Sequence, residues 1–258
     1  MHRLVCIPFS HYNEKARWGL DLYRQAYREE PWLPGLHLLP VAWAARGAEG
    51  ERGSPAATPL LITDGRRKLG DSATILHWLD REHAGRGPPL YPDPACTVLE
   101  RRFDRRLGPQ ARRLAYHWLF AEPAQLFRLG RANAPAAQAA AFERLWPLLA
   151  PPMRRGLGLD GETVARSRAA LLAEVAAVSG ELRGRRWLAG GRFSAADLSL
   201  ACMLSPVLLV QPEEGFGARL PPLDEAPEAV AALARQLRAT RAGEHALRMF
   251  AEQRRPRD

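Results

Sequence analysis

A stretch rich in proline and glycine, "AGRGPPLYPDP" at 84–94, divides the chain into two parts of different composition. Before it, short apolar runs typical of strands alternate with helical patterns. After it, strand patterns nearly vanish, and alanine, leucine and arginine predominate. Because such Pro and Gly clusters are typical of loops, we expect an α/β domain over 1–84, a linker over 85–93 and an all-helical domain over 94–258.

The first part has the periodicities of a small α/β unit. The apolar run "RLVCI" at 3–7 predicts a strand that is buried on both faces. Apolar residues at helical spacing predict a helix over 11–27, with a solvated face on its opposite side. That face carries the charged residues Glu14, Arg17, Asp21, Arg24 and Arg28. The pair Asp64-Gly65 lies between two short runs and predicts a hairpin with a type I′ turn. The other expected elements are a strand at 35–39, a short helix at 41–49 and a capped helix at 71–83.

The second part predicts five to seven helices. Pro109 should bend or break the helix expected over 98–118, because proline lacks the N–H that a helix interior needs. Six arginines cover one half of that segment: Arg101, Arg102, Arg105, Arg106, Arg112 and Arg113. In "FSAADLSLACMLSPVLL" at 193–209, Ser194 and Asp197 have the spacing of a capping box. The following residues are apolar nearly all round, which predicts a central buried helix.

The net charge of +9 would ordinarily suggest nucleic acid or an anionic membrane as a partner. Lys15 and Lys68 are the only lysines, however, and this excess of arginine is typical of a bias towards GC-rich codons. We therefore expect no nucleic-acid partner, since no zinc-finger or RNA-binding signature accompanies the charge. The sequence also lacks an apolar stretch long enough for a membrane span and a recognisable secretory signal.

Three scattered cysteines form neither a disulfide framework nor a metal-binding pattern. These are Cys6, Cys96 and Cys202. We expect a cytoplasmic protein without a metal.

The order of these motifs resembles the cytosolic glutathione transferase superfamily. A strand, a helix, a strand, a Thr-Pro before a hairpin and an Asp-Ser before a helix resemble a thioredoxin fold, and the "FSAADLSLA" helix resembles the core of the family's all-helical second domain. The stretch "SHYNEKARWGLDL" at 10–22 is similar to a bacterial, serine-type branch that often has Ser-His-Tyr-Cys there. The resemblance implies a homodimer that uses glutathione as a co-substrate.

Aligned on Arg17-Trp18, the resemblance puts Ser10 at the catalytic position, where it would hydrogen-bond the glutathione sulfur. Ser10 also fits a plain helix N-cap, and the two roles are compatible. Cys6 is an alternative nucleophile, although its place in a strand run favours a core position. Asn13 occupies the position of a resolving thiol and argues against disulfide exchange.

The resemblance also implies the glutathione-binding residues. Pro59 matches the family's cis-proline, and the backbone of Thr58 would pair with the cysteinyl part of glutathione. Asp71 and Ser72 match the pair that holds the γ-glutamyl end. An ordinary trans proline at Pro59 and simple capping by Asp71 and Ser72 remain the structural alternatives.

The second substrate's site would lie between the two domains. The candidates, on position alone, are His11, Tyr12, Tyr116 and His117. The arginine-rich face would be solvated, would attract an anionic substrate or would pair across a dimer interface.

Two classes of function follow from the resemblance. One is glutathione-dependent catalysis, by conjugation of glutathione to a small electrophile or by peroxide reduction, isomerisation or dehalogenation. The other is a non-catalytic adaptor or stress protein with the same fold. The presence of Ser10, Thr58-Pro59 and Asp71-Ser72 together favours the first.

Overall fold

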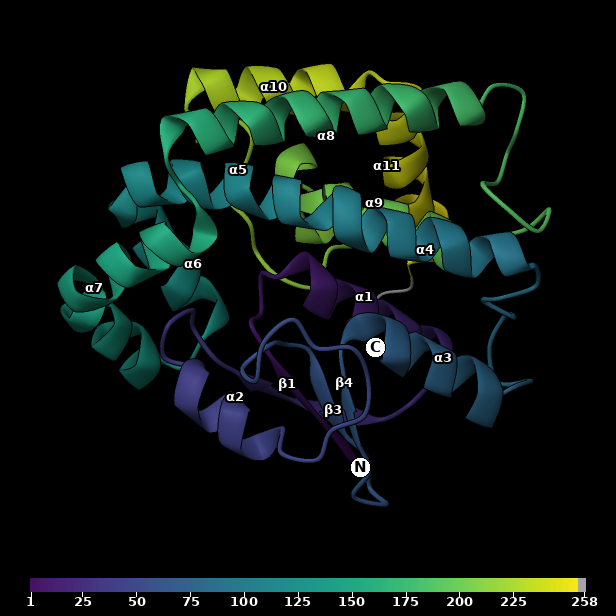
Figure 1. Cartoon of the computed structure of the whole chain (residues 1–258), viewed down its shortest axis with the longest axis horizontal. Coiled ribbons are helices and arrows are strands. Elements are labelled where there is room, and N and C mark those ends of the chain that lie inside the picture. Colours follow the sequence, from purple (N-terminus) through teal and green to yellow (C-terminus); the bar gives the residue numbers. More distant parts are fainter. Residues whose placement is uncertain (255–258) are drawn as a thin grey trace.

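The computed structural model describes residues 1–254. Strands occur only in the first part of this range, where they form one sheet with three helices (Figure 1). These elements are β1 (His2–Cys6), α1 (His11–Leu22), β2 (Tyr27–Pro31), α2 (Leu38–Ala44), β3 (Leu60–Ile62), β4 (Lys68–Gly70) and α3 (Ser72–Glu82). The strand order is β2-β1-β3-β4, with β1 parallel to β2 and all other neighbours antiparallel. This is the predicted thioredoxin-like arrangement.

Helices cover both faces of the sheet. Val5 and Leu60 pack against α2 on one face, while Leu4 and Leu61 join the core beneath α1 and α3 on the other. The strand β1 is therefore buried on both faces, as its apolar run predicted.

Residues 94–254 are mainly helical and contain no strand, which confirms the predicted class of the second domain. Its elements are α4 (Pro94–Arg106), α5 (Gly108–Ala121), α6 (Pro123–Asn133), α7 (Ala136–Leu157), α8 (Gly161–Glu181), α9 (Ala195–Leu208), the 3₁₀ turn η1 (Pro212–Glu214), α10 (Glu228–Arg238) and α11 (Arg241–Gln253). Within the described residues this is eight α-helices, so the expected number of five to seven was too low. Prolines cause much of the difference, because α5 and α6 each have one in the first turn and α7 follows one.

The helix α9 lies at the centre of the helical domain. All its residues are buried, and it packs against α1, α4, α5, α10 and α11. The Ser194 N–H donates to an Asp197 carboxylate oxygen over 3.1 Å, which completes the predicted capping box. No helix among residues 1–254 is both long and apolar enough to cross a membrane.

In the first part, one predicted helix is shorter than expected and one predicted strand is not a strand. The helix expected to reach residue 27 ends at Leu22, because Arg24 has a left-handed backbone and turns the chain into β2. The strand expected at 35–39 is a turn that leads into α2, since Gly35 also has positive φ. The true second strand, "YREEP", escaped notice because an edge strand of polar residues lacks an apolar run.

The β3–β4 hairpin exists, but its turn is not type I′. Such a turn needs positive φ at both central residues, whereas here Arg66 has positive φ and Asp64 and Gly65 do not. The Arg66 N–H donates to the Thr63 carbonyl, and the Thr63 N–H donates to the Arg67 carbonyl. The loop is therefore the three-residue kind, with a left-handed last residue.

Candidate active site

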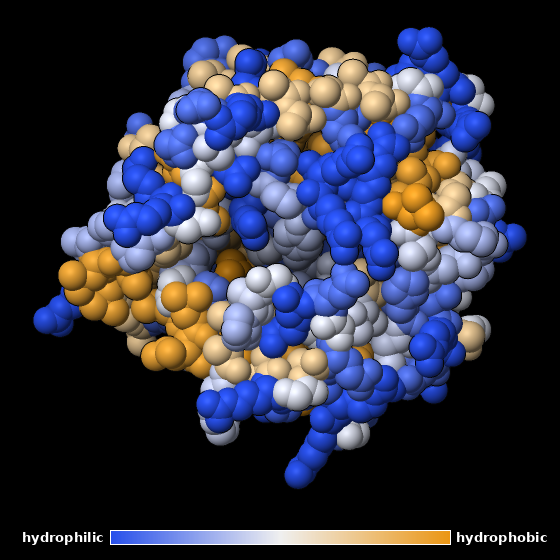
Figure 2. Space-filling view, viewed as in Figure 1, coloured by the Kyte–Doolittle hydropathy of each residue, from blue (hydrophilic) through white to orange (hydrophobic). Residues whose placement is uncertain are grey.

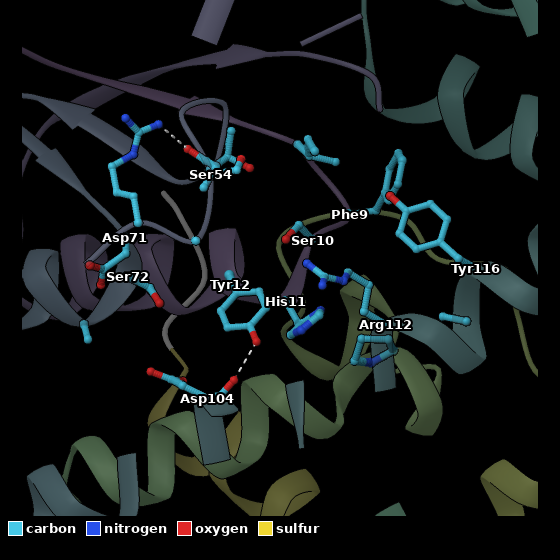
Figure 3. A pocket seen from close by; sticks show the side chains of 18 of the residues that line it. Phe9, Ser10, His11, Tyr12, Ser54, Asp71, Ser72, Asp104, Arg112 and Tyr116 are labelled. Atoms are coloured by element: carbon cyan, nitrogen blue, oxygen red, sulfur yellow. Dashed lines mark hydrogen bonds between the residues drawn. The ribbon is translucent and has the colours of Figure 1, made fainter. Parts of the chain in front are cut away.

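A cavity of about 1400 Å³ lies between the start of α1, the 50–58 loop, the start of α3 and the helices α4 and α5 (Figures 2 and 3). It exceeds the roughly 300–1000 Å³ of a typical small-molecule site. Seven predicted site residues line it: Ser10, His11, Tyr12, Thr58, Asp71, Ser72 and Tyr116. Pro59 and His117 are not part of this lining.

Ser10 has the N-cap position of α1 but does not cap the helix with its side chain. Its backbone is extended, and its carbonyl accepts a hydrogen bond from the Glu14 N–H over 2.9 Å. The hydroxyl makes no capping hydrogen bond within residues 1–254, and it faces the cavity (Figure 3). The first N–H groups of α1 also lack partners within the helix, so this end carries a partial positive charge.

The peptide bond between Thr58 and Pro59 is cis. The carbonyl of Pro59 accepts a hydrogen bond from the Asp71 N–H over 3.1 Å, which ties this turn to the start of α3. The Thr58 hydroxyl accepts a hydrogen bond from Nδ2 of Asn13 over 3.1 Å. Asn13 is fully buried, so it holds the Thr58 side chain in place from the first turn of α1. The sequence gives no sign of this bond, since the two residues lie far apart along the chain.

Asp71 caps α3 and borders the cavity. Its carboxylate accepts from the Thr74 N–H over 3.0 Å and from the Thr74 hydroxyl over 2.9 Å. Its φ of 90° is unusual for a residue with a side chain and is typical of functional turns. Burial raises the pKa of Asp71, while the bonds from Thr74 oppose that rise. Ser72 is buried beside it as the first residue of the helix.

A buried lysine forms ion pairs with two further acidic residues that line the cavity. Lys15 Nζ lies 2.6 Å from Oδ2 of Asp104 and 2.8 Å from Oε1 of Glu100. Burial raises the pKa of Asp104, and Lys15 opposes the rise. These pairs also join α1 to α4, so they hold the first domain against the second.

The candidates for the second substrate's site lie in different surroundings. The Tyr12 hydroxyl donates to the Asp104 carbonyl over 2.7 Å. Burial lowers the pKa of His11 to about 3, with a further contribution from Arg112, so His11 is neutral at physiological pH. Burial raises the pKa of Tyr116, which is therefore a neutral phenol. His117 is half-buried on α5 outside the cavity lining.

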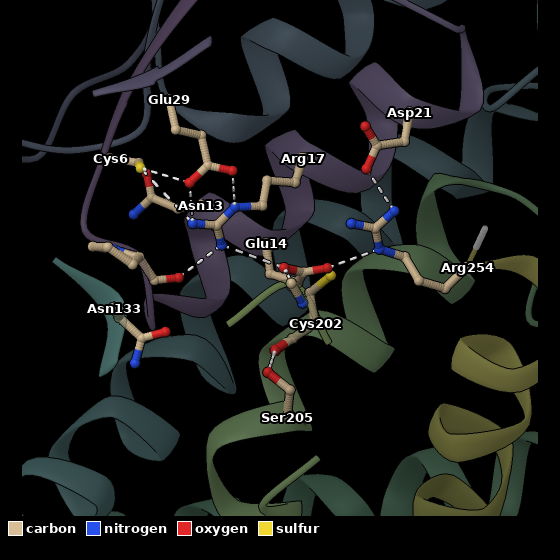
Figure 4. A network of polar contacts seen from close by, with 12 residues as sticks. Cys6, Asn13, Glu14, Arg17, Asp21, Glu29, Asn133, Cys202, Ser205 and Arg254 are labelled. Carbon is tan, nitrogen blue, oxygen red and sulfur yellow. Dashed lines mark hydrogen bonds and ion pairs between the residues drawn. The ribbon is translucent and has the colours of Figure 1, made fainter. Parts of the chain in front are cut away.

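The solvated face predicted for residues 11–27 was wrong at Glu14 and Arg17, which are buried in a network of charges (Figure 4). Arg24 and Arg28 are exposed, as predicted. Arg17 donates to both carboxylate oxygens of Glu29, over 2.8 and 2.9 Å, and to the Pro8 carbonyl over 2.7 Å. Glu14 accepts from Nε of Arg254 over 2.8 Å. Alternating charges predict a solvated helix face only when no second domain covers it, and here the helical domain does. The bond to Pro8 fixes the turn that leads into Ser10.

Cys6 belongs to this network and not to the cavity. Its thiol is fully buried and donates to Glu29 over 3.5 Å. Burial raises the pKa of Cys6 to about 12. A thiol in this state is a poor nucleophile, so the alternative assignment to Cys6 has no support.

Two family models match the chain. Residues 4–87 match the model described as "Glutathione S-transferase, N-terminal domain", and residues 161–236 match "Glutathione S-transferase, C-terminal domain". The chain belongs to the glutathione S-transferase superfamily. Residues 88–160 lie between the two matches, and they include α4 and α5, which form one wall of the cavity.

Solved structures of superfamily members share this fold at low sequence identity. Glutathione transferase GSTFuA3 from Phanerochaete chrysosporium is 16% identical with a TM-score of 0.65, and the match covers 100% of this chain and 98% of that one. The glutathione S-transferase CsGST63524 of Ceriporiopsis subvermispora, in complex with glutathione, is 15% identical with a TM-score of 0.58 and coverages of 100% and 99%. A glutathione S-transferase from Methylobacillus flagellatus KT with GSH bound is 15% identical with a TM-score of 0.51 and coverages of 95% and 98%. A comparison with curated protein sequences found no match.

Proposed function

We propose that this protein binds glutathione and activates its thiol for conjugation to a small electrophile. The observation that carries the proposal is the Ser10 hydroxyl. It makes no capping hydrogen bond at the start of α1, and it faces a cavity that Thr58, Asp71 and Ser72 also line. In this proposal Asp71 and Ser72 hold the γ-glutamyl end of glutathione. The backbone of Thr58, fixed by the cis peptide to Pro59, pairs with the cysteinyl part.

The proposed role of Ser10 is to stabilise the thiolate. A thiol with a pKa near 8.5 is only about 3% ionised at pH 7. A hydroxyl donor and a helix N-terminus that together favour the anion by about 2 kcal/mol lower this pKa by roughly 1.5 units, to near 7. About half of the bound glutathione is then thiolate, and Ser10 needs only to donate a hydrogen bond.

The reaction follows directly from the thiolate. Its sulfur attacks an electrophilic carbon and forms a carbon–sulfur bond with its own electron pair, while the leaving group departs with the pair of the broken bond. The proton of the thiol is released to solvent on binding. Asn13 at the fourth position of the motif supports this serine-type chemistry over exchange through two protein cysteines.

Two variants separate the proposed roles. Asp71→Asn keeps an oxygen that can cap Thr74 but removes the charge, so it should weaken glutathione binding in calorimetric titration and leave the pKa of the bound thiol unchanged. Ser10→Ala should retain most of the binding and raise that pKa, as followed by the ultraviolet absorbance of the thiolate. A wild-type protein that binds no glutathione at millimolar concentration rules out the proposal. An unchanged thiol pKa in Ser10→Ala rules out the role of Ser10 alone.

The proposal includes a cytoplasmic homodimer, which the resemblance to the cytosolic, bacterial serine-type branch implies. Three buried cysteines without a disulfide among the described residues fit a reducing compartment. Analytical ultracentrifugation of the purified chain tests the dimer.

A further inference from the structure

The charged residues that line the cavity have partners, with one exception. Arg101 and Arg105 pair with Glu51, whereas Glu100 and Asp104 pair with Lys15. Arg52 donates to the carbonyls of Ala45, Pro55 and Ala57. Among residues 1–254, no hydrogen bond or ion pair to the Arg112 guanidinium is found. Four arginines of the face that was predicted to be solvated are exposed: Arg101, Arg105, Arg106 and Arg112. Of these, Arg112 is the one that lines the cavity without a hydrogen bond or ion pair among the described residues.

Arg112 lies on the opposite side of Ser10 from Asp71 and Ser72 in the view of Figure 3. Its side chain extends from α5 towards Ser10 and passes near His11. The residues that we propose for glutathione all belong to the first domain, whereas Arg112 belongs to the second. Arg112 therefore faces the cavity from the domain that supplies none of the proposed glutathione contacts.

The surroundings of Arg112 are neutral and largely apolar. His11 is uncharged, Tyr116 is a phenol one helical turn further along α5, and Phe9, Trp118 and Leu119 line the same cavity. Arg112 itself is exposed on the cavity wall, and the acids that line this cavity are bonded to other residues. A cation that faces a cleft without a partner of its own attracts anions into that cleft. A guanidinium can also donate two parallel hydrogen bonds to one carboxylate.

We propose that Arg112 binds a carboxylate on the second substrate and that Phe9 and Tyr116 contact that substrate's apolar body. This inference rests on the proposed function and specifies its substrate class: an electrophile with an apolar, preferably aromatic, body and a carboxylate remote from the reacting carbon. Arg112 is then the residue that determines specificity, and Ser10 remains the residue that acts on sulfur.

A matched pair of substrates tests the inference. A chlorodinitrobenzoate and the corresponding chlorodinitrobenzamide differ only in the charged group, and glutathione displaces chloride from both. The thiolate sulfur bonds to the ring carbon, and chloride leaves with the electrons of the carbon–chlorine bond. After correction for the uncatalysed rates, the wild type should prefer the benzoate in kcat/KM by about 10-fold to 100-fold.

Variants assign this preference to one side chain. Arg112→Gln should abolish it by lowering kcat/KM for the benzoate alone, and Arg112→Lys should retain part of it. Arg106→Gln is the matched control, because Arg106 is an exposed arginine outside the cavity lining and its loss changes the net charge equally. Calorimetric titration of the benzoate in the absence of glutathione should show the same order of affinities.

Three outcomes overturn the inference. The first is a variant Arg112→Gln in which kcat/KM falls equally for both substrates and the pKa of the bound glutathione thiol rises, since Arg112 would then act on the thiolate. The second is weaker glutathione binding in that variant, since Arg112 would then hold glutathione itself. The third is a wild type that binds glutathione and converts both substrates without preference, which leaves the proposed function intact. If glutathione does not bind at all, the proposed function fails, and the titration of the benzoate alone still decides whether Arg112 binds a carboxylate.

Discussion

The buried amide of Asn13 donates a hydrogen bond to the hydroxyl of Thr58, with 3.1 Å between Nδ2 and Oγ1. This bond joins the first turn of α1, which begins after Ser10, to the residue before the cis peptide. It therefore sets the distance between the proposed sulfur site and the proposed cysteinyl site.

A double-mutant cycle measures this bond. Thr58→Val leaves the buried Asn13 amide without its partner and should lower the free energy of unfolding by about 1–3 kcal/mol. Asn13→Ala removes a hydrogen bond to the half-buried Thr58 hydroxyl and should cost about 1 kcal/mol. The double variant should lose less than the sum of the two, with a coupling energy of about 1 kcal/mol in urea denaturation. Both single variants should also weaken glutathione binding. Additive losses would show that the two side chains act independently.

The ion pair between the buried Arg17 and the half-buried Glu29 should stabilise the fold far more than a surface pair. Arg17→Met leaves acidic groups without their cation in the protein interior, and we expect a loss of about 3–5 kcal/mol in unfolding free energy. Arg166→Met removes an exposed pair with Glu162 on α8 and should cost about 0.5 kcal/mol or less. Arg17→Lys keeps the charge, and its loss of unfolding free energy should lie between the losses of Arg17→Met and Arg166→Met. Equal losses in Arg17→Met and Arg166→Met would contradict the role given to the buried network.

His11 should make the protein less stable in mild acid. Burial, with a contribution from Arg112, lowers the pKa of His11 to about 3, whereas the unfolded chain has a pKa near 6.5. Between these values the unfolded state binds more protons than the native state, so the unfolding free energy falls as the pH falls below about 6.5. At pH 5 this group alone should cost about 2 kcal/mol relative to pH 7. His11→Gln should flatten the dependence of stability on pH in this window, and parallel curves for the two proteins would refute the assignment.

Gly108 should not tolerate a side chain. A Cβ atom there would overlap the Tyr12 hydroxyl and lie 2.7 Å from Sδ of Met203, so Gly108→Ala should push Tyr12 away from the Asp104 carbonyl. We expect a loss of about 1–3 kcal/mol in thermal or urea unfolding. Gly180→Ala, in the last turn of α8 with nothing near its Cβ position, should instead stabilise the protein by about 0.5–1 kcal/mol. A similar response of the two variants would exclude a steric role for Gly108.

Local patterns predicted the elements whose signals lie within a few residues. The apolar run of β1 and the capping box of Ser194 and Asp197 both depend on neighbours along the chain, and both are present. The arginines near Pro109 and the polar strand β2 depend on partners elsewhere. Arg102 pairs with Glu174 and Glu181 of α8, and no local pattern could reveal that.

The predictions for the site residues also divide into those that follow from local motifs and those that depend on partners distant in the sequence. Family motifs drew attention to Ser10, Thr58, Asp71 and Ser72, and the fold brings all four to one cavity. Asn13 was considered only as a motif position without a thiol, and Arg112 only as one of six arginines that could attract an anionic substrate. Their individual contacts involve residues that meet them only after folding. The alternating charges also misled the prediction for Glu14 and Arg17, since a charged helix face has the same sequence whether it meets water or a buried counter-ion.

Arg254 follows α11 and pairs with Glu14 and Asp21 of α1. Local opening of α1 would therefore expose several buried charges at once, and it would break contacts with the last helix of the described chain. Segments coupled in this way exchange their amide hydrogens as one cooperative unit, at a rate set by nearly complete unfolding. We therefore expect the hydrogen-bonded amides from Glu14 to Asp21 to exchange slowly, together with those of α11. A ligand held at the start of α1 should then protect the amides of α11 from exchange without contacting them.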